Sequence, residues 1–116
     1  MSEKICFVTN KEPFEYTLSI MSGKWKFKII YLLACTSPVR YGVLKRNISG
    51  ITHKMLSTQL KELEREDIVT RKEYPQVPPK VEYDLTPKGL SLIPIVLAMC
   101  DWGRENINKT LQPGSF

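Results

Sequence analysis

The chain has 116 residues, the length of one domain with a core of its own. Apolar residues make up 42% of it and charged residues 25%, values typical of a soluble globular protein. No apolar run approaches the roughly 20 residues that span a membrane, and the N-terminus has no signal-peptide core. We therefore expect a cytoplasmic protein without a membrane partner.

Positive charge is concentrated in the first half of the chain. The net charge is +5, but residues 1–61 hold ten basic and three acidic side chains, whereas residues 62–116 hold seven and nine. No acidic residue occurs between Glu15 and Glu62, while eight basic ones do. Such a block indicates a polyanionic partner. A membrane surface is the competing partner, but it usually needs a basic helix with an exposed apolar face.

Three cysteines and one histidine limit the chemistry that the chain can perform. Their spacing fits no zinc site, and an odd number of cysteines in a cytoplasmic chain argues against a disulfide framework. We expect Cys35 and Cys100 to be small buried hydrophobes. The sequence contains no paired-carboxylate site, nucleophilic triad or phosphate-binding glycine loop, so we predict no enzyme, no metal and no cofactor.

The chain begins with a polar tail, residues 1–12, followed by a first helix that we place at 13–22. Pro13 suits the first turn of that helix. A second helix starts at Lys24, carries apolar residues at helical spacing and stops before a turn cluster at 36–38. We expect three aromatic residues on apolar helical patterns to lie in the core: Trp25, Tyr41 and Trp102.

Residues 39–67 have the pattern of two helices joined by a tight turn. The first helix is short and ends at Ser49-Gly50, and the second begins at Thr52, a good N-cap. The pattern predicts a helix-turn-helix. Taken alone, the polar ridge of the second helix fits a DNA-contacting face and a solvated face about equally. The apolar stripe consists of Leu56, Leu60 and Leu63, and the ridge of Lys54, Thr58, Lys61 and Arg65.

After residue 67 the hydrophobic period changes from helical to alternating. Residues 68–74 and 81–85 are candidate strands, and the proline-rich segment between them cannot belong to a central strand. A β-hairpin directly after a helix of this kind is the wing of a winged helix, which we place at 68–85.

A last helix opens with Thr86 as its cap and Pro87 at its first position. We expect it to run to about residue 108, with a bend at Pro94, and to be followed by a tail at 109–116. Its apolar residues form two seams, of which one small domain covers only one. The second seam predicts a homodimer to which the first helix also contributes.

These elements predict one α+β, mostly helical domain at residues 13–108, a winged helix-turn-helix with dimerisation helices at 13–22 and 87–108. The chain resembles the HxlR-type family of bacterial winged-helix transcriptional regulators, relatives of the MarR type, over roughly residues 13–104. The motifs that carry the resemblance are Gly23-Lys24-Trp25, Tyr41-Gly42-Val43-Leu44, Gly50-Ile51-Thr52-His53-Lys54-Met55-Leu56, Leu60-Lys61-Glu62-Leu63-Glu64, residues 74–83, Leu85-Thr86 and Trp102-Gly103.

The resemblance implies a homodimeric DNA-binding regulator. The helix from Thr52 would enter the major groove, and the wing, near Gln76 to Lys80, would contact backbone or minor groove. The first and last helices would form the dimer. Many members of the family are similar to sensors of oxidative or electrophilic stress, through a cysteine just before the proline that opens the first helix. Here that position is Glu12 and the nearest cysteine is Cys6, which makes Cys6 the candidate redox sensor.

The charge block, the helix ridge and the resemblance together favour DNA contact over a solvated face. Serine and threonine can hydrogen-bond bases or phosphates, and lysine pairs with phosphate or guanine. Arg40 and Lys24 are candidates for DNA backbone contact, with ordinary solubility as the alternative. The candidate groove-contacting residues are His53, Lys54, Ser57, Thr58 and Lys61, and those of the wing are Gln76 and Lys80.

We therefore predict a sequence-specific regulator that binds double-stranded DNA. It would be a homodimeric repressor of a pseudo-palindromic operator, with half-sites roughly 10 bp apart. The sequence leaves the input signal open between a small molecule and an oxidant or electrophile. The alternative function is a winged-helix module that binds protein and has no specific affinity for DNA.

Overall fold

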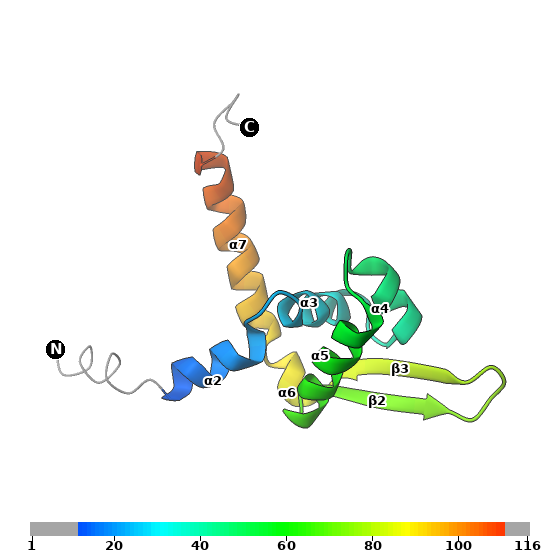
Figure 1. The fold of residues 1–116 in the computed structure, drawn as a ribbon. Helices are drawn as coiled ribbons and strands as arrows, with labels where there is room; N and C mark the ends of the chain where they lie inside the picture. The colour runs from blue at the N-terminus through cyan, green and yellow to red at the C-terminus, as the bar shows by residue number, and fades with distance from the viewer. Residues whose placement is uncertain (1–11, 111–116) are drawn as a thin grey trace.

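The computed structural model describes residues 12–110, with side chains to residue 108. Helices and a small sheet form a body from which a long helix and a β-hairpin project in different directions (Figure 1). The helices are α2 (Glu12–Met21), α3 (Lys26–Thr36), α4 (Tyr41–Asn47), α5 (His53–Arg65), α6 (Pro87–Leu90) and α7 (Ile93–Thr110), and the strands are β1 (Val39–Arg40), β2 (Val69–Tyr74) and β3 (Lys80–Leu85).

The core of the body is built around α3. Its Ile29, Ile30 and Leu33 are fully buried, and the helix packs against α5, β3 and α7. The apolar stripe of α5, including Leu56 and Leu60, faces the same core. Because this stripe is buried, the polar ridge of α5 is turned outward.

Three antiparallel strands in the order β1-β3-β2 complete the body. β2 and β3 pair from Val69 opposite Leu85 to Tyr74 opposite Lys80, and the chain between them forms the tip of the wing. β1 has no signal in the sequence, because a strand of two residues is too short to show a periodicity. The predicted fold class, an α+β and mostly helical winged helix, is confirmed.

The prediction of one continuous helix at 87–108 is wrong. The structure divides this segment into α6 and α7, with a break at Ser91. Thr86 caps α6 by accepting a hydrogen bond from the N–H of Gly89 at 2.9 Å. Pro94 is the second residue of α7, where a backbone N–H has no intrahelical partner to lose. Pro94 therefore lies in the first turn of a new helix and does not bend an old one.

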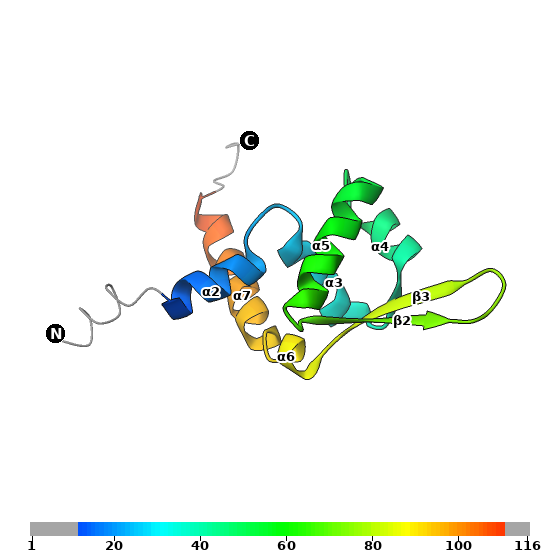
Figure 2. The ribbon, with the colours of Figure 1, turned by 60° about the horizontal axis from the view of Figure 1, so that its bottom comes forward.

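The α2 and α7 helices lie on the side of the body away from the wing (Figures 1 and 2). Both helices leave apolar side chains exposed. Trp25 is buried and Tyr41 half-buried, but Trp102 is 71% exposed, so its predicted core position is wrong. Cys35 is exposed, contrary to prediction, and Cys100 is half-buried. Helical periodicity identifies an apolar face but does not show whether the same chain covers it. The exposed apolar residues are Phe14, Tyr16 and Leu18 on α2 and Ile95, Leu97, Met99, Trp102 and Ile107 on α7.

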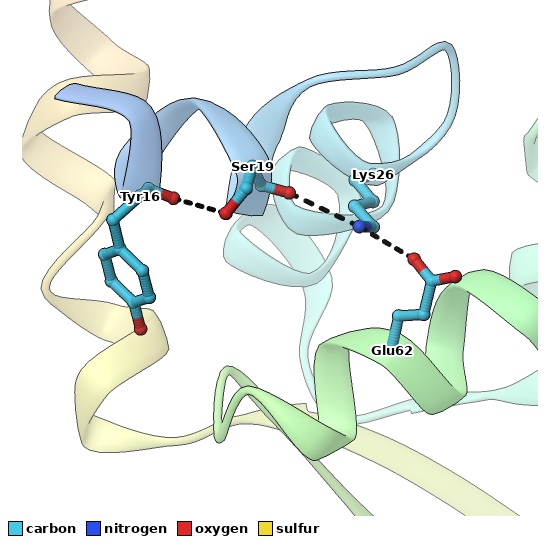
Figure 3. A network of polar contacts seen from close by, with 4 residues as sticks. All are labelled: Tyr16, Ser19, Lys26 and Glu62. Carbon is cyan, nitrogen blue, oxygen red and sulfur yellow. Dashed lines mark hydrogen bonds and ion pairs between the residues drawn. The ribbon is translucent and has the colours of Figure 1, made fainter. Parts of the chain in front are cut away.

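Lys26 joins three helices by polar contacts (Figure 3). Its Nζ donates a hydrogen bond to the backbone oxygen of Ser19 on α2 at 3.3 Å and lies 2.8 Å from Oε1 of Glu62 on α5. The hydrogen bond from Lys26 holds the pKa of the Glu62 carboxyl below its usual range. Lys26 belongs to the basic block of the sequence, but its charge is paired with Glu62 of the same chain.

A second polar contact joins α2 to the C-terminal end of α5. The Nζ of Lys88 donates to the hydroxyl of Tyr16 at 2.5 Å and to the backbone oxygen of Glu66 at 2.9 Å. The hydrogen bond with Tyr16 raises the pKa of Lys88. The orientation of α2 is therefore coupled to α5 at two points, one in the last turn of α5 at Glu62 and one just past its end at Glu66.

Candidate nucleic-acid interface

The start of α5 is held by a cap and a glycine turn. The side-chain oxygen of Thr52 accepts a hydrogen bond from the N–H of Met55 at 3.1 Å, as predicted. Gly50 in the preceding turn has a φ of +84°, a conformation that glycine adopts without strain. The ring of Trp25 lies 3.8 Å from the place that a Cβ on Gly50 would occupy. A core residue thus supports the turn that sets where α5 begins.

The predicted contact residues of α5 lie on its outward side, but they differ in exposure and in their contacts with the rest of the chain. His53, Lys54, Thr58 and Lys61 are exposed, whereas Ser57 is half-buried. Lys54, Thr58 and Lys61 form no hydrogen bond or ion pair with the described part of the chain. His53 and Ser57 both contact Tyr41 of α4. Two lysines and one hydroxyl on α5 are therefore available to an external partner.

A groove of about 790 Å³ runs between α5, the start of α4 and the wing. We call it the basic groove, because five of its lining side chains are cationic and only Glu64 is acidic. Such an excess of positive charge in a concave surface attracts a polyanion. Four predicted site residues line this groove: Arg40, Ser57, Lys61 and Lys80. Two arginines that were not predicted as site residues also line it, Arg46 and Arg71.

Arg71 on β2 lies directly opposite Tyr83 on β3. The hydrogen bond with Tyr83 raises the pKa of Arg71, and burial raises the pKa of the Tyr83 phenol. Arg71 therefore stays charged, and Tyr83 stays protonated, at physiological pH. The ion pair of Arg71 with Glu73, at 3.4 Å, is largely exposed and contributes little to its neutralisation.

The wing tip carries little free charge. The Nζ of Lys80 lies 3.4 Å from Oε2 of Glu82 and 4.4 Å from the centre of the Tyr74 ring, so Lys80 has partners within the wing. Gln76 is exposed, and the neighbouring Val77 is 98% exposed. The tip thus presents an amide and an apolar side chain, while the cations of the wing lie nearer the base of the wing.

Five predicted site residues do not line the basic groove: His53, Lys54 and Thr58 on α5, Gln76 at the wing tip, and Lys24. Of these, Lys24 comes from a different part of the chain, just before α3. Its Nζ lies 4.9 Å from the centre of the Trp25 ring, which places it beside the turn before α5. Arg46 and Arg71 were missed as site residues. Arg46 belongs to the acid-free block and Arg71 adjoins the proline-rich tip, but only the packing of α4 and the strand register place both in the groove.

Within residues 12–110, no group of three His, Cys, Asp or Glu side chains could hold a metal ion. In the same part of the chain, no helix is both long enough and apolar enough to span a bilayer. Cys6, the candidate redox sensor, lies outside the described residues. The described surface therefore offers a basic groove and an exposed helix face as its candidate functional features.

Known proteins share both this sequence and this fold. The sequence model of the family described as "HxlR-like helix-turn-helix" matches residues 20–111. An HTH-type transcriptional regulator of Halalkalibacterium halodurans is 60% identical over 97 residues, which cover 84% of this chain and 86% of that protein. The HTH-type transcriptional regulator YdzF of Bacillus subtilis is 52% identical over 95 residues, 82% of this chain and 87% of its own.

Among solved structures, the redox regulator HypR in its reduced form has the same fold, with a TM-score of 0.80 and 44% identity. The match covers 85% of this chain and 97% of that one. These relatives and this structural neighbour are all regulators with a DNA-binding fold, and none of them is an enzyme. The chain belongs to the HxlR-like helix-turn-helix family of DNA-binding transcriptional regulators.

Proposed function

We propose that this regulator is a homodimeric repressor that binds a pseudo-palindromic operator in double-stranded DNA. Helix α5 would lie in the major groove, and the wing would contact the flanking backbone or minor groove. The observation that carries the proposal is the basic groove, which adjoins the exposed ridge of α5 at Lys61 and is also lined by the half-buried Ser57. The sugar-phosphate backbone that separates the major from the minor groove of the DNA would lie in the basic groove of the protein. There its phosphates would meet several cations.

The proposed contacts divide into two classes. Lys54, Lys61 and the arginines of the basic groove would pair with phosphates, which gives affinity without sequence preference. His53, Ser57 and Thr58 would contact base edges or phosphates near the start of the helix. Gln76 and Lys80 would act from the wing, and Lys24 from beside the turn, as secondary backbone contacts.

The dimer that we propose would form through α2 and α7. Exposed apolar patches of this extent are uncommon on a monomer, and they are typical of protein interfaces. Their largest members are aromatic, the residue type most enriched in the energetic centre of interfaces. A two-fold axis through these helices would present two copies of α5 to half-sites about 10 bp apart. Repression then requires only that the dimer occupies its operator.

The proposed input signal is an oxidant or electrophile, because HypR, at 44% identity, is a redox regulator. Cys6 is the candidate from sequence, and Cys35 is the exposed cysteine of the described residues. Operator affinity should be measured before and after peroxide or quinone treatment in Cys6→Ser and Cys35→Ser proteins. Loss of the response in one variant would identify the sensor, and an equal response in both would reject these two sites.

The test of the DNA-binding proposal is selection of bound fragments from sheared genomic DNA at two salt concentrations. We expect recovery of one palindromic sequence. Lys61→Ala should lower the slope of log affinity against log salt by about one, the contribution of one phosphate contact. Arg104→Ala removes the same charge from α7, where Arg104 pairs with Asp101 at 3.0 Å, and should leave the slope unchanged. If no fragment is recovered at either salt, the protein-binding module becomes the better hypothesis.

A further inference from the structure

The first residue of α4, Tyr41, joins three parts of the interface. Its ring is stacked on the imidazole of His53, with centroids 5.8 Å apart and planes 7° apart. On the wing side it meets the ring of Tyr83 at 6.5 Å and 47°. Tyr41 also lines the basic groove. The half-buried phenol therefore contacts α5 and β3 from a third element, although its apolar helical pattern predicts a core residue.

The hydroxyl of Tyr41 is surrounded by groups of α5. It lies 3.1 Å from Nδ1 of His53, 3.2 Å from the backbone oxygen of His53 and 3.2 Å from Oγ of Ser57. A phenol has one proton to donate and two lone pairs to accept with. It can donate to Nδ1 when that nitrogen carries no proton. When Nδ1 is protonated, the phenol can accept from it and donate to the backbone oxygen instead.

This arrangement orients the imidazole in either protonation state. Because Nδ1 is turned toward the phenol, Nε2 on the other side of the ring is directed away from Tyr41, and His53 is exposed. The hydroxyl of Ser57, one turn later on α5, has the same phenol as its partner. Two of the candidate contact side chains thus have a defined geometry before any DNA is bound.

We propose that Tyr41 is a positioning residue for DNA recognition, which holds His53 with Nε2 facing the DNA and fixes the hydroxyl of Ser57. The inference rests on the proposed function and deepens it. When Nδ1 accepts from the phenol, Nε2 carries a proton, and its partner is a hydrogen-bond acceptor, either a phosphate oxygen or the N7 or O6 of a purine. Contacts made by side chains that are already ordered lose less conformational entropy on binding, so removal of the phenol oxygen weakens the complex without removing a DNA contact.

The experiment measures operator affinity in Tyr41→Phe protein, which keeps the ring and loses the hydroxyl. We expect affinity to fall about five- to tenfold, the equivalent of one net hydrogen bond. The salt slope stays unchanged, because no phosphate contact is lost. Tyr31→Phe is the matched control, since Tyr31 is exposed on α3 and its hydroxyl has no hydrogen bond with the described residues.

A double-mutant cycle distinguishes positioning from direct contact. In a His53→Ala, Ser57→Ala background, Tyr41→Phe should have no further effect on affinity, because the side chains that it positions are gone. An undiminished effect in that background overturns the proposal, and so does an unchanged affinity of the single variant. A loss confined to one operator position identifies a base contact by His53, and a uniform loss across sequences identifies a phosphate contact.

The single histidine of the chain provides a readout that needs no DNA. The imidazole nitrogen resonances of free protein should move between wild type and Tyr41→Phe and stay in place in Tyr31→Phe. Identical resonances in all three proteins overturn the positioning role. If wild-type protein binds no DNA at any salt, the proposed function fails instead, and the resonances still report whether Tyr41 orients His53.

Discussion

The winged body and the pair α2 and α7 contrast in how they use their apolar residues. In the body, the apolar faces of α3, α5 and the sheet cover one another, and their central residues have almost no exposed surface. In α7, only Val96 is buried among residues 93–108, and Leu97, Met99 and Trp102 are about half-exposed or more. The body covers its own apolar faces, whereas the apolar surface of the two helices is what the proposed dimer would bury.

Leu60 and Leu97 give the largest expected difference between the two regions. Leu60 is 1% exposed on α5, so Leu60→Ala should lower the free energy of unfolding by about 3 kcal/mol through lost burial and a cavity. Leu97 is 56% exposed, and Leu97→Ala should cost less than about 0.5 kcal/mol at dilute, monomeric protein. Urea unfolding of both variants measures this, and equal losses would break the comparison.

Trp102 tests whether a partner covers α7. Trp102→Glu should weaken self-association by about 2 kcal/mol or more, as expected of an aromatic residue at an interface centre. The protein should then sediment as a monomer at micromolar concentration, with far-ultraviolet circular dichroism unchanged. Asn108→Glu, which adds the same charge to an exposed polar position of α7, serves as the control. A dimer that persists in Trp102→Glu would place the interface elsewhere.

The cap of α5 should have an intermediate effect. Thr52→Ala removes the acceptor of the Met55 N–H and should lower the free energy of unfolding by about 1 kcal/mol. Thr52→Ser keeps the acceptor and should retain most of that stability. The test compares the denaturation midpoints of wild type, Thr52→Ala and Thr52→Ser. Equal midpoints of the alanine and serine variants would show that the cap hydrogen bond contributes nothing to stability.

The smallest effect is expected at the ion pair between Lys26 on α3 and Glu62 on α5. The pKa of Glu62 is lowered by Lys26, so the folded state binds a proton less readily than the unfolded state. This contribution is therefore fully present above the ordinary carboxyl pKa and is lost as the pH falls through the lowered one. Because Glu62 is about one-third exposed, Glu62→Gln should cost only about 0.5 kcal/mol at neutral pH.

The pH dependence provides the check on that pair. The difference in stability between wild type and Glu62→Gln should shrink as the pH falls below the ordinary carboxyl pKa and through the lowered pKa of Glu62, where the carboxyl becomes protonated. Glu105→Gln, on the exposed part of α7, should show no comparable difference. A difference between wild type and Glu62→Gln that stays constant with pH would indicate a cause other than the charge of Glu62.

Local chemistry accounts for what the sequence by itself determined. The stripe of α5, the cap at Thr52, the alternation in the wing and the cap at Thr86 depend on residues a few positions apart, so their period and side-chain type are readable directly. The same information predicted the fold class and the outward ridge of α5.

Only the tertiary structure decided which of these residues meet. Lys26 belongs to the basic block, yet it pairs with Glu62, while Arg46 and Arg71 join Lys61 in the groove. Tyr41 reaches His53 across 12 positions of sequence, and Trp102 is left exposed by the rest of residues 12–108. These contacts depend on the angles at which helices and strands pack. No periodicity along the chain encodes those angles, because they result from the fit of whole side-chain surfaces.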